Sequence, residues 1–359
     1  MLMTPPMAED LKVLEQYLTS DVADNATSSE PYVRVSSSSK DDSIVYLSLP
    51  RQRQSSHLVV SIDHVDVPWL ADMSSLIHAG KGLQATVDPG RAQREIMEQI
   101  LGEQKVEVLR LYFRKIHPCL PVIDEASFWS MWQGDRARIS SPLLCQMYAV
   151  SLVFWHCSPA LRDRGQPDMA FAWNMAVVAL RDDLLAPCKT TVHASLLVIT
   201  GRPTIGVTGN VVKAGSMITL AHSLALHRDP TSWQIPQAEK RIRINAWWGV
   251  IIHDYWSSIA HGTPPNIQRE NYDVPLPTSN TSGEGSSLSF RHLSSISEVL
   301  GDTLPLVYAL RMDPKDAEKR VRRIECRLDV WVDELPTTLK EPRSGLCLAR
   351  KRLVKCCMH

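Results

Sequence analysis

The eight cysteines are the residues of this chain best suited to metal or redox chemistry. No two of them form a C-x-x-C pair, the local arrangement that is typical of zinc sites. Their spacing instead favours buried free thiols in a reducing compartment, and we expect neither bound zinc nor any other cofactor. They stand at Cys119, Cys145, Cys157, Cys188, Cys326, Cys347, Cys356 and Cys357.

Signatures of enzymes are incomplete or missing. His227-Arg228-Asp229 spells the H-R-D of a kinase catalytic loop, but Gln234 occupies the position where that loop needs an asparagine for magnesium. The chain has no phosphate-binding G-x-x-x-x-G-K-[ST], no H-E-x-x-H and no G-x-S-x-G. His253 and Asp254 would point about 100° apart on a helix, so they do not converge with His261 on one metal. We do not expect an enzyme.

The composition is typical of a globular chain and lacks the excess charge of a protein that binds nucleic acid. Its 359 residues are 44% hydrophobic, enough for a sizeable core. Lys plus Arg and Asp plus Glu both number 39, so the basic excess of a protein that grips phosphates is missing. No secretory signal and no apolar run of membrane-spanning length is visible, so we expect no membrane partner.

The chain divides into an arm and a helical domain. Residues 1–89 are polar in part, with short β-prone runs at 44–46 and 58–62 that could form a small ribbon, and we expect a loosely ordered arm. From Gly90 the apolar spacing becomes helical and no alternating strand pattern remains. We predict an all-α domain over 90–342, followed by a tail at 343–359.

Several helices can be placed by their apolar faces and by the residues at their ends. Ser141-Pro142 and Asp313-Pro314 are typical helix starts. Gly262 and Pro264 end a long helix that starts at Gln237. The Ser-, Thr- and Gly-rich stretch 278–289 predicts a loop. The expected buried positions are Leu109, Tyr112, Phe113, Ile116, the run 143–155, Phe171, Met175, Val178, Ala179, Val211, Ala214, Ile218, Ala221, Ala225, Leu293, Ile296, Val299, Leu300, Ile324, Leu328 and Trp331.

One stretch carries an ordered set of distinctive residues, from His227 to Pro277. This order resembles the fungal-specific transcription factor domain, the regulatory middle region of fungal zinc-cluster transcription factors. Ala225 departs from that pattern, which usually has glycine there. The resembling positions are His227, Arg228, Asp229, Pro230, Trp233, Glu239, Arg243, Trp247, Trp248, Asp254, Gly262, Pro264, Asp273 and Pro277, and the likeness extends outward to 112–128 and 328–336.

The resemblance implies a nuclear regulator of transcription by RNA polymerase II. Its partners would be other transcription factors or coregulators, and a small-molecule inducer stays open. The family's zinc cluster needs six cysteines ahead of this domain, and no cysteine precedes Cys119. We therefore expect DNA contact only indirectly, with zinc confined to a cluster that these residues lack, and a domain that is cut short near its end. Activator or repressor action, target genes and oligomeric state stay open.

The motif itself has two interpretations, a brace at a helix junction, which we favour, or a ligand pocket between helices. Arg243 and Asp254 lie three turns apart on one face, so we expect Asp254 to pair with Arg243 or Arg228 while partly buried. Glu239 and Arg243 form an expected surface pair. Two other functions stay open, a helical interaction protein without a transcriptional role and, less favoured, an enzyme on a helical scaffold.

Overall fold

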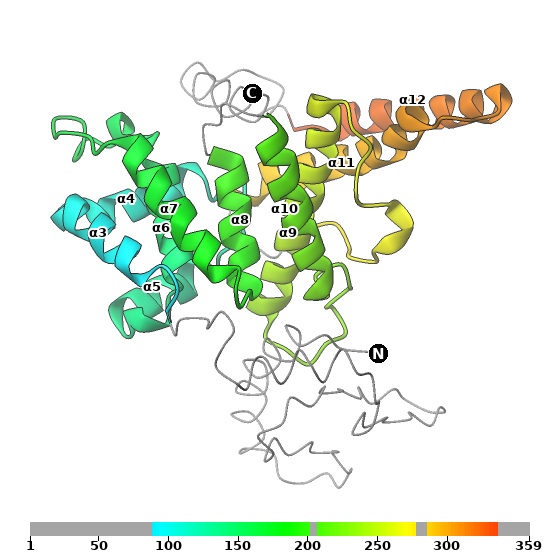
Figure 1. Ribbon diagram of the computed structural model, residues 1–359. Coiled ribbons are helices and arrows are strands. Elements are labelled where there is room, and N and C mark those ends of the chain that lie inside the picture. Colours follow the sequence, from blue (N-terminus) through cyan, green and yellow to red (C-terminus); the bar gives the residue numbers. More distant parts are fainter. Residues whose placement is uncertain (1–87, 202–206, 278–285, 337–359) are drawn as a thin grey trace, which may run out of the picture.

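The computed structural model describes residues 88–201, 207–277 and 286–336, and over these ranges it contains helices and no strand (Figure 1). This confirms the all-α fold for the described residues. Apart from Asp88 and Pro89, the expected arm with its ribbon lies outside them, as does the expected tail. The helices are α3 (Arg91–Leu101), α4 (Lys105–Lys115), α5 (Glu125–Gln133), α6 (Ser141–Leu152), α7 (Met169–Asp183), α8 (Lys189–Gly201), α9 (Val207–Ser223), α10 (Gln237–His261), α11 (Ser286–Tyr308) and α12 (Pro314–Glu334).

Helix α6 is the centre of the first group of helices, where α3, α4, α7 and α8 pack around it. Every residue from Ser141 to Leu152 is buried, as the largely apolar run 143–155 predicts, but Val153 of that run is exposed. The helix starts one residue earlier than expected, because the Ser140 side chain accepts the Leu143 amide and Pro142 lies in the first turn. A helix buried on all sides fixes the positions of its neighbours.

Helix α4 buries the face that its spacing predicts, with Leu109, Tyr112, Phe113 and Ile116 all in the core. Helix α7 differs from the prediction. Phe171 is exposed, whereas Ala172, Trp173, Ala176 and Ala179 are buried, so the inward face is rotated relative to the expected one. Small residues on that face let α7 approach α6 closely.

Helices α8, α9 and α10 form a middle layer, visible in green in Figure 1. Gly262 ends α10 in the left-handed conformation, with φ 67°, and its amide donates to the Ser258 carbonyl, as expected. Ala225 lies just after α9 at φ 55°, a conformation that costs a residue with a Cβ about 1–2 kcal/mol. This explains why glycine suits that position better than alanine.

Helices α11 and α12 lie at one edge of the molecule, and α11 is the main neighbour of α12 (Figure 1). Of the expected loop at 278–289, residues 278–285 lie outside the described residues, and residues 286–289 belong to α11, which starts at Ser286. Asp313 caps α12 as expected, by accepting the Lys315 amide. On α12 the prediction of three buried residues is wrong: Ile324 is buried, Trp331 is partly buried and Leu328 is exposed.

Two expectations on composition can be compared with the described residues. The cysteines described are free thiols, but only Cys145 is buried, and Cys157 and Cys326 are exposed, so the expectation of general burial is wrong. Cys347, Cys356 and Cys357 lie outside the described ranges. None of the described helices has the length and apolarity to cross a membrane.

Candidate regulatory junction around helix α10

The motif residues line one continuous structure, which we call the α10 junction. It consists of the 224–236 connector, α10 itself and the 262–277 exit segment, which returns along α10. The structure distributes the motif over four contacts, namely a buried charge cluster, an aromatic cluster, a backbone clip and a surface contact to Asp273. The residues placed there are His227, Arg228, Asp229, Trp233, Glu239, Arg243, Trp247, Trp248, Asp254, Gly262 and Pro264.

A charge cluster is buried at the first turns of α10. Lys189, at the start of α8, places its Nζ 2.5 Å and 2.6 Å from the two carboxylate oxygens of Glu239. Arg243 Nε donates to Glu239 Oε1 at 3.0 Å, and its guanidinium lies over the Trp233 ring at 5.3 Å. The expected surface pair therefore exists but is not at the surface, because the Glu239 side chain is 16% exposed and that of Arg243 is 3% exposed.

The electrostatics of this cluster follow from its burial. Burial by itself favours a protonated Glu239, but the charges of Lys189 and Arg243 outweigh it and hold the pKa of Glu239 below its ordinary value. His193, one turn after Lys189, is buried beside them. Burial, assisted by those two cations, lowers the pKa of His193 to about 3, so this histidine is neutral at physiological pH.

An aromatic cluster lies at the middle of α10. The Trp247 ring is fully buried and packs against His222, His227 and Tyr272, with centroids 5.1, 6.0 and 5.6 Å away. Its Nε1 and the Nδ1 of His227 have no hydrogen-bond partner within the described part of the chain. Trp248 Nε1 donates to the Pro275 carbonyl at 2.7 Å. These contacts hold the exit segment against α10 mainly through apolar packing.

The backbone clip corrects the expected partner of Asp254. Its carboxylate accepts hydrogen bonds from the Asn266 amide at 3.1 Å, the Asn266 side chain at 2.9 Å and the Ile267 amide at 2.7 Å. Arg243 cannot reach it, because eleven residues along a helix correspond to about 16 Å of rise. Burial raises the pKa of Asp254 above its ordinary value, although these donors partly offset the effect.

The other expected partner of Asp254 is engaged elsewhere. Arg228 lies 3.0 Å from Asp273 in the exit segment, and both side chains are about half exposed. Asp273 also accepts the Asp229 amide at 2.6 Å, while the Asp229 side chain accepts the Thr231 amide at 2.9 Å and so caps a turn. Arg228 and the backbone of Asp229 thus contact Asp273 of the exit segment at the surface of the junction, and neither residue pairs with Asp254.

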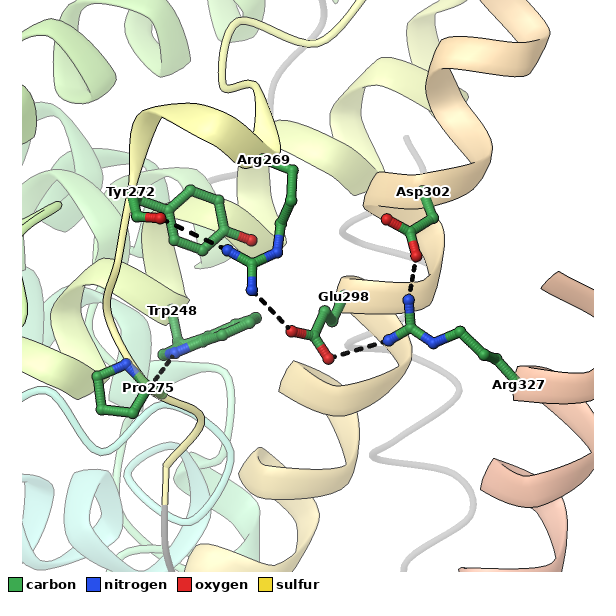
Figure 2. Close-up of polar contacts among 7 residues, drawn as sticks. All are labelled: Trp248, Arg269, Tyr272, Pro275, Glu298, Asp302 and Arg327. Atoms are coloured by element: carbon green, nitrogen blue, oxygen red, sulfur yellow. Dashed lines mark hydrogen bonds and ion pairs between the residues drawn. The ribbon is translucent and has the colours of Figure 1, made fainter. Parts of the chain in front are cut away.

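The exit segment continues the junction to α11 and α12 (Figure 2). Arg269 stacks on Tyr272 at 4.6 Å and contacts Glu298 of α11 at 3.3 Å. Glu298 in turn contacts Arg327 of α12 at 3.0 Å, and Arg327 also pairs with Asp302. Figure 2 shows these groups in one row from the exit segment across α11 to α12. The row joins the motif to the edge of the molecule.

The polar side chains of the junction contact one another and the backbone. Over the described residues, no cluster of His, Cys, Asp or Glu has the arrangement of a metal site. The buried charged groups are engaged by one another and by backbone amides, whereas Arg228 and Asp273 are about half exposed. An apolar pocket of about 370 Å³ lies away from the motif, between α3, α6 and α7, and Met97, Ile100, Leu152 and Phe171 are among its lining residues.

Sequence reasoning missed several residues that complete the junction or contact it. They are Lys189 and His193 of α8, Asn266, Ile267 and Tyr272 of the exit segment, Glu298 of α11 and Arg327 of α12. The residues from α8, α11 and α12 are distant in sequence from α10, and those of the exit segment carry no local signal that connects them to Asp254. The run 189–201 contains an apolar stretch, Ala194 to Ile199, that could have indicated a buried helix next to α10.

Comparison with known proteins identifies a family whose matched region includes the α10 junction. The family model described as "Fungal specific transcription factor domain" matches residues 109–333, more than half of the chain. A transcriptional regulatory protein of Schizosaccharomyces pombe is 29% identical over 217 residues, covering 57% of this chain and 32% of its own. The transcriptional activator protein DAL81 of Saccharomyces cerevisiae is 26% identical, covering 48% of this chain and 18% of its own.

The acetamidase regulatory protein of Aspergillus fumigatus is 24% identical over 241 residues, covering 65% of this chain and 31% of its own. This chain thus spans a third or less of the length of these relatives. No solved structure matches it. The matched region begins in α4 and ends in α12, so it takes in the whole α10 junction. The chain belongs to the fungal-specific transcription factor domain family.

Proposed function

We propose that this chain regulates transcription by RNA polymerase II in the nucleus, through a helical regulatory domain built on the α10 junction. The observation that carries the proposal is the family match over 109–333, which contains every motif residue from His227 to Pro264. The relatives that it resembles are named as transcriptional activators and regulators, which supports the same role here. That role does not require catalysis, and we propose no enzymatic activity.

The proposed mechanism is protein–protein contact. The domain has a rigid centre, because α10 is held by α8, α9, α11 and the exit segment at the same time. A rigid helical scaffold presents surfaces to other transcription factors or coregulators without rearranging itself. Contact with DNA is then indirect, through those partners, which agrees with a formal net charge of zero.

In this proposal a small-molecule inducer binds in the apolar pocket between α3, α6 and α7. At about 370 Å³ the pocket is within the usual range for small-molecule sites, and its lining is mostly aliphatic and aromatic. The α10 junction is less suitable, because its side chains are already packed against one another. This assignment separates the pocket from the motif, in contrast to the alternative in which the motif itself forms the pocket.

Chromatin occupancy of the whole chain in a fungal host tests the proposal. We expect enrichment at a limited set of promoters, lost when the apolar core is disrupted by Trp247→Asp. The matched control is Ile259→Asp, since Ile259 is 53% exposed on the same helix. A chain that is absent from nuclei, or spread evenly over chromatin, would contradict a transcriptional role. A helical interaction protein with another role would give that second outcome while still binding partners in extracts.

A further inference from the structure

Helix α12 carries an apolar stripe that the rest of the described chain leaves exposed. We call it the outer stripe, and it consists of Val321, Leu328 and Val332. Their spacing of seven and four residues puts them on one face of the helix. Val321 is 44% exposed and Val332 is 50% exposed, although both are β-branched apolar residues on a helix rich in charge.

A different face of α12 holds it to the domain. Ile324 is buried, Arg327 bonds to Glu298 and Asp302 of α11, and Trp331 Nε1 donates to the His292 carbonyl at 3.3 Å. The outer stripe is rotated away from these contacts, and α12 lies at the edge of the molecule (Figure 1). One face of α12 therefore packs against α11, and the adjacent face with the outer stripe is not covered by other described residues.

The charges of α12 are segregated along its length. Its first half, 314–323, has five basic residues against two acidic ones, and its second half, 324–334, has one basic residue against four acidic ones. The two halves thus carry net charges of about +3 and −3 by formal count at neutral pH. The residues are Lys315, Lys319, Arg320, Arg322 and Arg323 against Asp316 and Glu318, then Arg327 against Glu325, Asp329, Asp333 and Glu334.

This polarity opposes the helix's own macrodipole. A helix has a positive amino end and a negative carboxyl end, so basic residues near the start and acidic residues near the end are unfavourable. The pattern therefore does not serve the stability of an isolated helix. It does complement a second helix with the same pattern that runs in the opposite direction, because each positive half then lies beside a negative half.

We propose that the outer stripe of α12 is an interaction surface for a second copy of this chain, paired antiparallel about a twofold axis near Leu328. Leu328 then packs against Leu328 of the other copy, and Val321 packs against Val332. Arg322 and Asp333 flank the stripe on one side, so each copy's Arg322 lies near the other's Asp333. Such an isologous contact closes on itself as a dimer.

The stripe is short, so the dimer is of the weak class. Interfaces below about 1,200 Å² in total area belong to transient contacts, and a dissociation constant of about 1–100 µM is expected. Sedimentation of the whole chain over a range of concentrations measures it. We expect reversible dimers for the natural chain, and monomers when Leu328→Glu places a charge at the axis. A natural chain that stays monomeric throughout would overturn the proposal, whether another protein or another part of this chain covers the stripe.

Charge exchange tests the orientation. Lys315→Glu with Arg322→Glu, and separately Asp329→Arg with Asp333→Arg, should each weaken self-association at least about tenfold. Mixing the two variant chains should restore association, and so should all four changes in one chain, because the pattern is then reversed but still self-complementary. If the fourfold variant associated no better than either double variant, antiparallel pairing would be wrong.

The four charge substitutions are not expected to destabilise α12 itself. All four substitutions place acidic residues early and basic residues late in α12, the direction that the macrodipole favours. Within the described chain, the only ion pair that these substitutions remove is the exposed contact of Arg322 with Glu318 at 2.6 Å. Circular dichroism should therefore show unchanged helix content in every variant. Weakened association together with lost helicity would count against the charge argument.

Discussion

Replacing Glu239 by alanine tests the buried charge cluster directly. Glu239 is the one carboxylate shared by Lys189 and Arg243, and all three side chains are largely removed from water. Glu239→Ala removes the carboxylate that contacts both of these cations in the interior. Breaking a buried pair by removing one partner costs about 3–5 kcal/mol in unfolding free energy, because the remaining charge stays desolvated.

The matched control is Arg228→Ala. Arg228 pairs with Asp273 at 3.0 Å, similar to the Arg243–Glu239 distance, but both of its side chains are about half exposed. Water screens such a pair, which makes it worth about 0–1 kcal/mol. Burial, and not distance, is then the variable that separates the two substitutions.

The assay is urea unfolding of the whole chain, followed by circular dichroism at neutral pH. We expect Glu239→Ala to shift the midpoint strongly and Arg228→Ala to shift it little, with an unchanged slope. The pKa of Glu239 is held below its ordinary value of 4.5, so its contribution is complete above that pH and is lost as the pH falls through the lower folded value. Equal midpoints for the two variants at neutral pH would refute the assignment of a buried cluster.

Three further perturbations follow from the same structure. The pKa of His193 is about 3 in the folded chain and 6.5 ordinarily, so unfolding takes up a proton at pH values between the two. The free energy of unfolding should therefore fall by up to about 1.4 kcal/mol per pH unit as the pH drops below 6.5. His193→Phe should reduce this pH dependence in thermal melts recorded at several pH values. Gly301→Ala would place a Cβ 2.5 Å from the Tyr255 ring and should lower the free energy of unfolding in urea by about 1–3 kcal/mol. A decrease below about 0.5 kcal/mol would show that α11 can move away from α10. Gly262→Ala meets no atom within 4 Å but keeps φ at 67°, so it should cost only about 1–2 kcal/mol by the same assay, and a larger loss would indicate a tighter turn than the structure shows.

The sequence predicted those parts of the fold that local patterns determine. The start and end of α10 follow from residues at its own ends. The burial of α4 follows from its apolar spacing, and that of α6 follows from its largely apolar sequence. The prediction was wrong for Leu328, because a stripe at helical spacing shows that a face is apolar but not whether another element covers it.

The junction could be located from sequence but its contacts could not be assigned. The motif identified α10, its connector and its exit segment as one unit, and the structure brings them together. The pairing of Asp254 with arginine was wrong because sharing a helix face was taken as contact, while the rise per residue keeps Arg243 far away. The exposure of the Glu239 pair was misjudged because Lys189 arrives from α8, which no local signal connects to α10.

A tethered reporter tests the central claim most directly. The whole chain is fused to an unrelated DNA-binding domain, and expression from a promoter with the matching site is measured in a fungal host. We predict that the natural chain and Arg228→Ala change expression to the same extent, in either direction. Glu239→Ala should lose the effect because it unfolds the junction. A natural chain that leaves expression unchanged while it occupies the promoter at full level would contradict a regulatory domain.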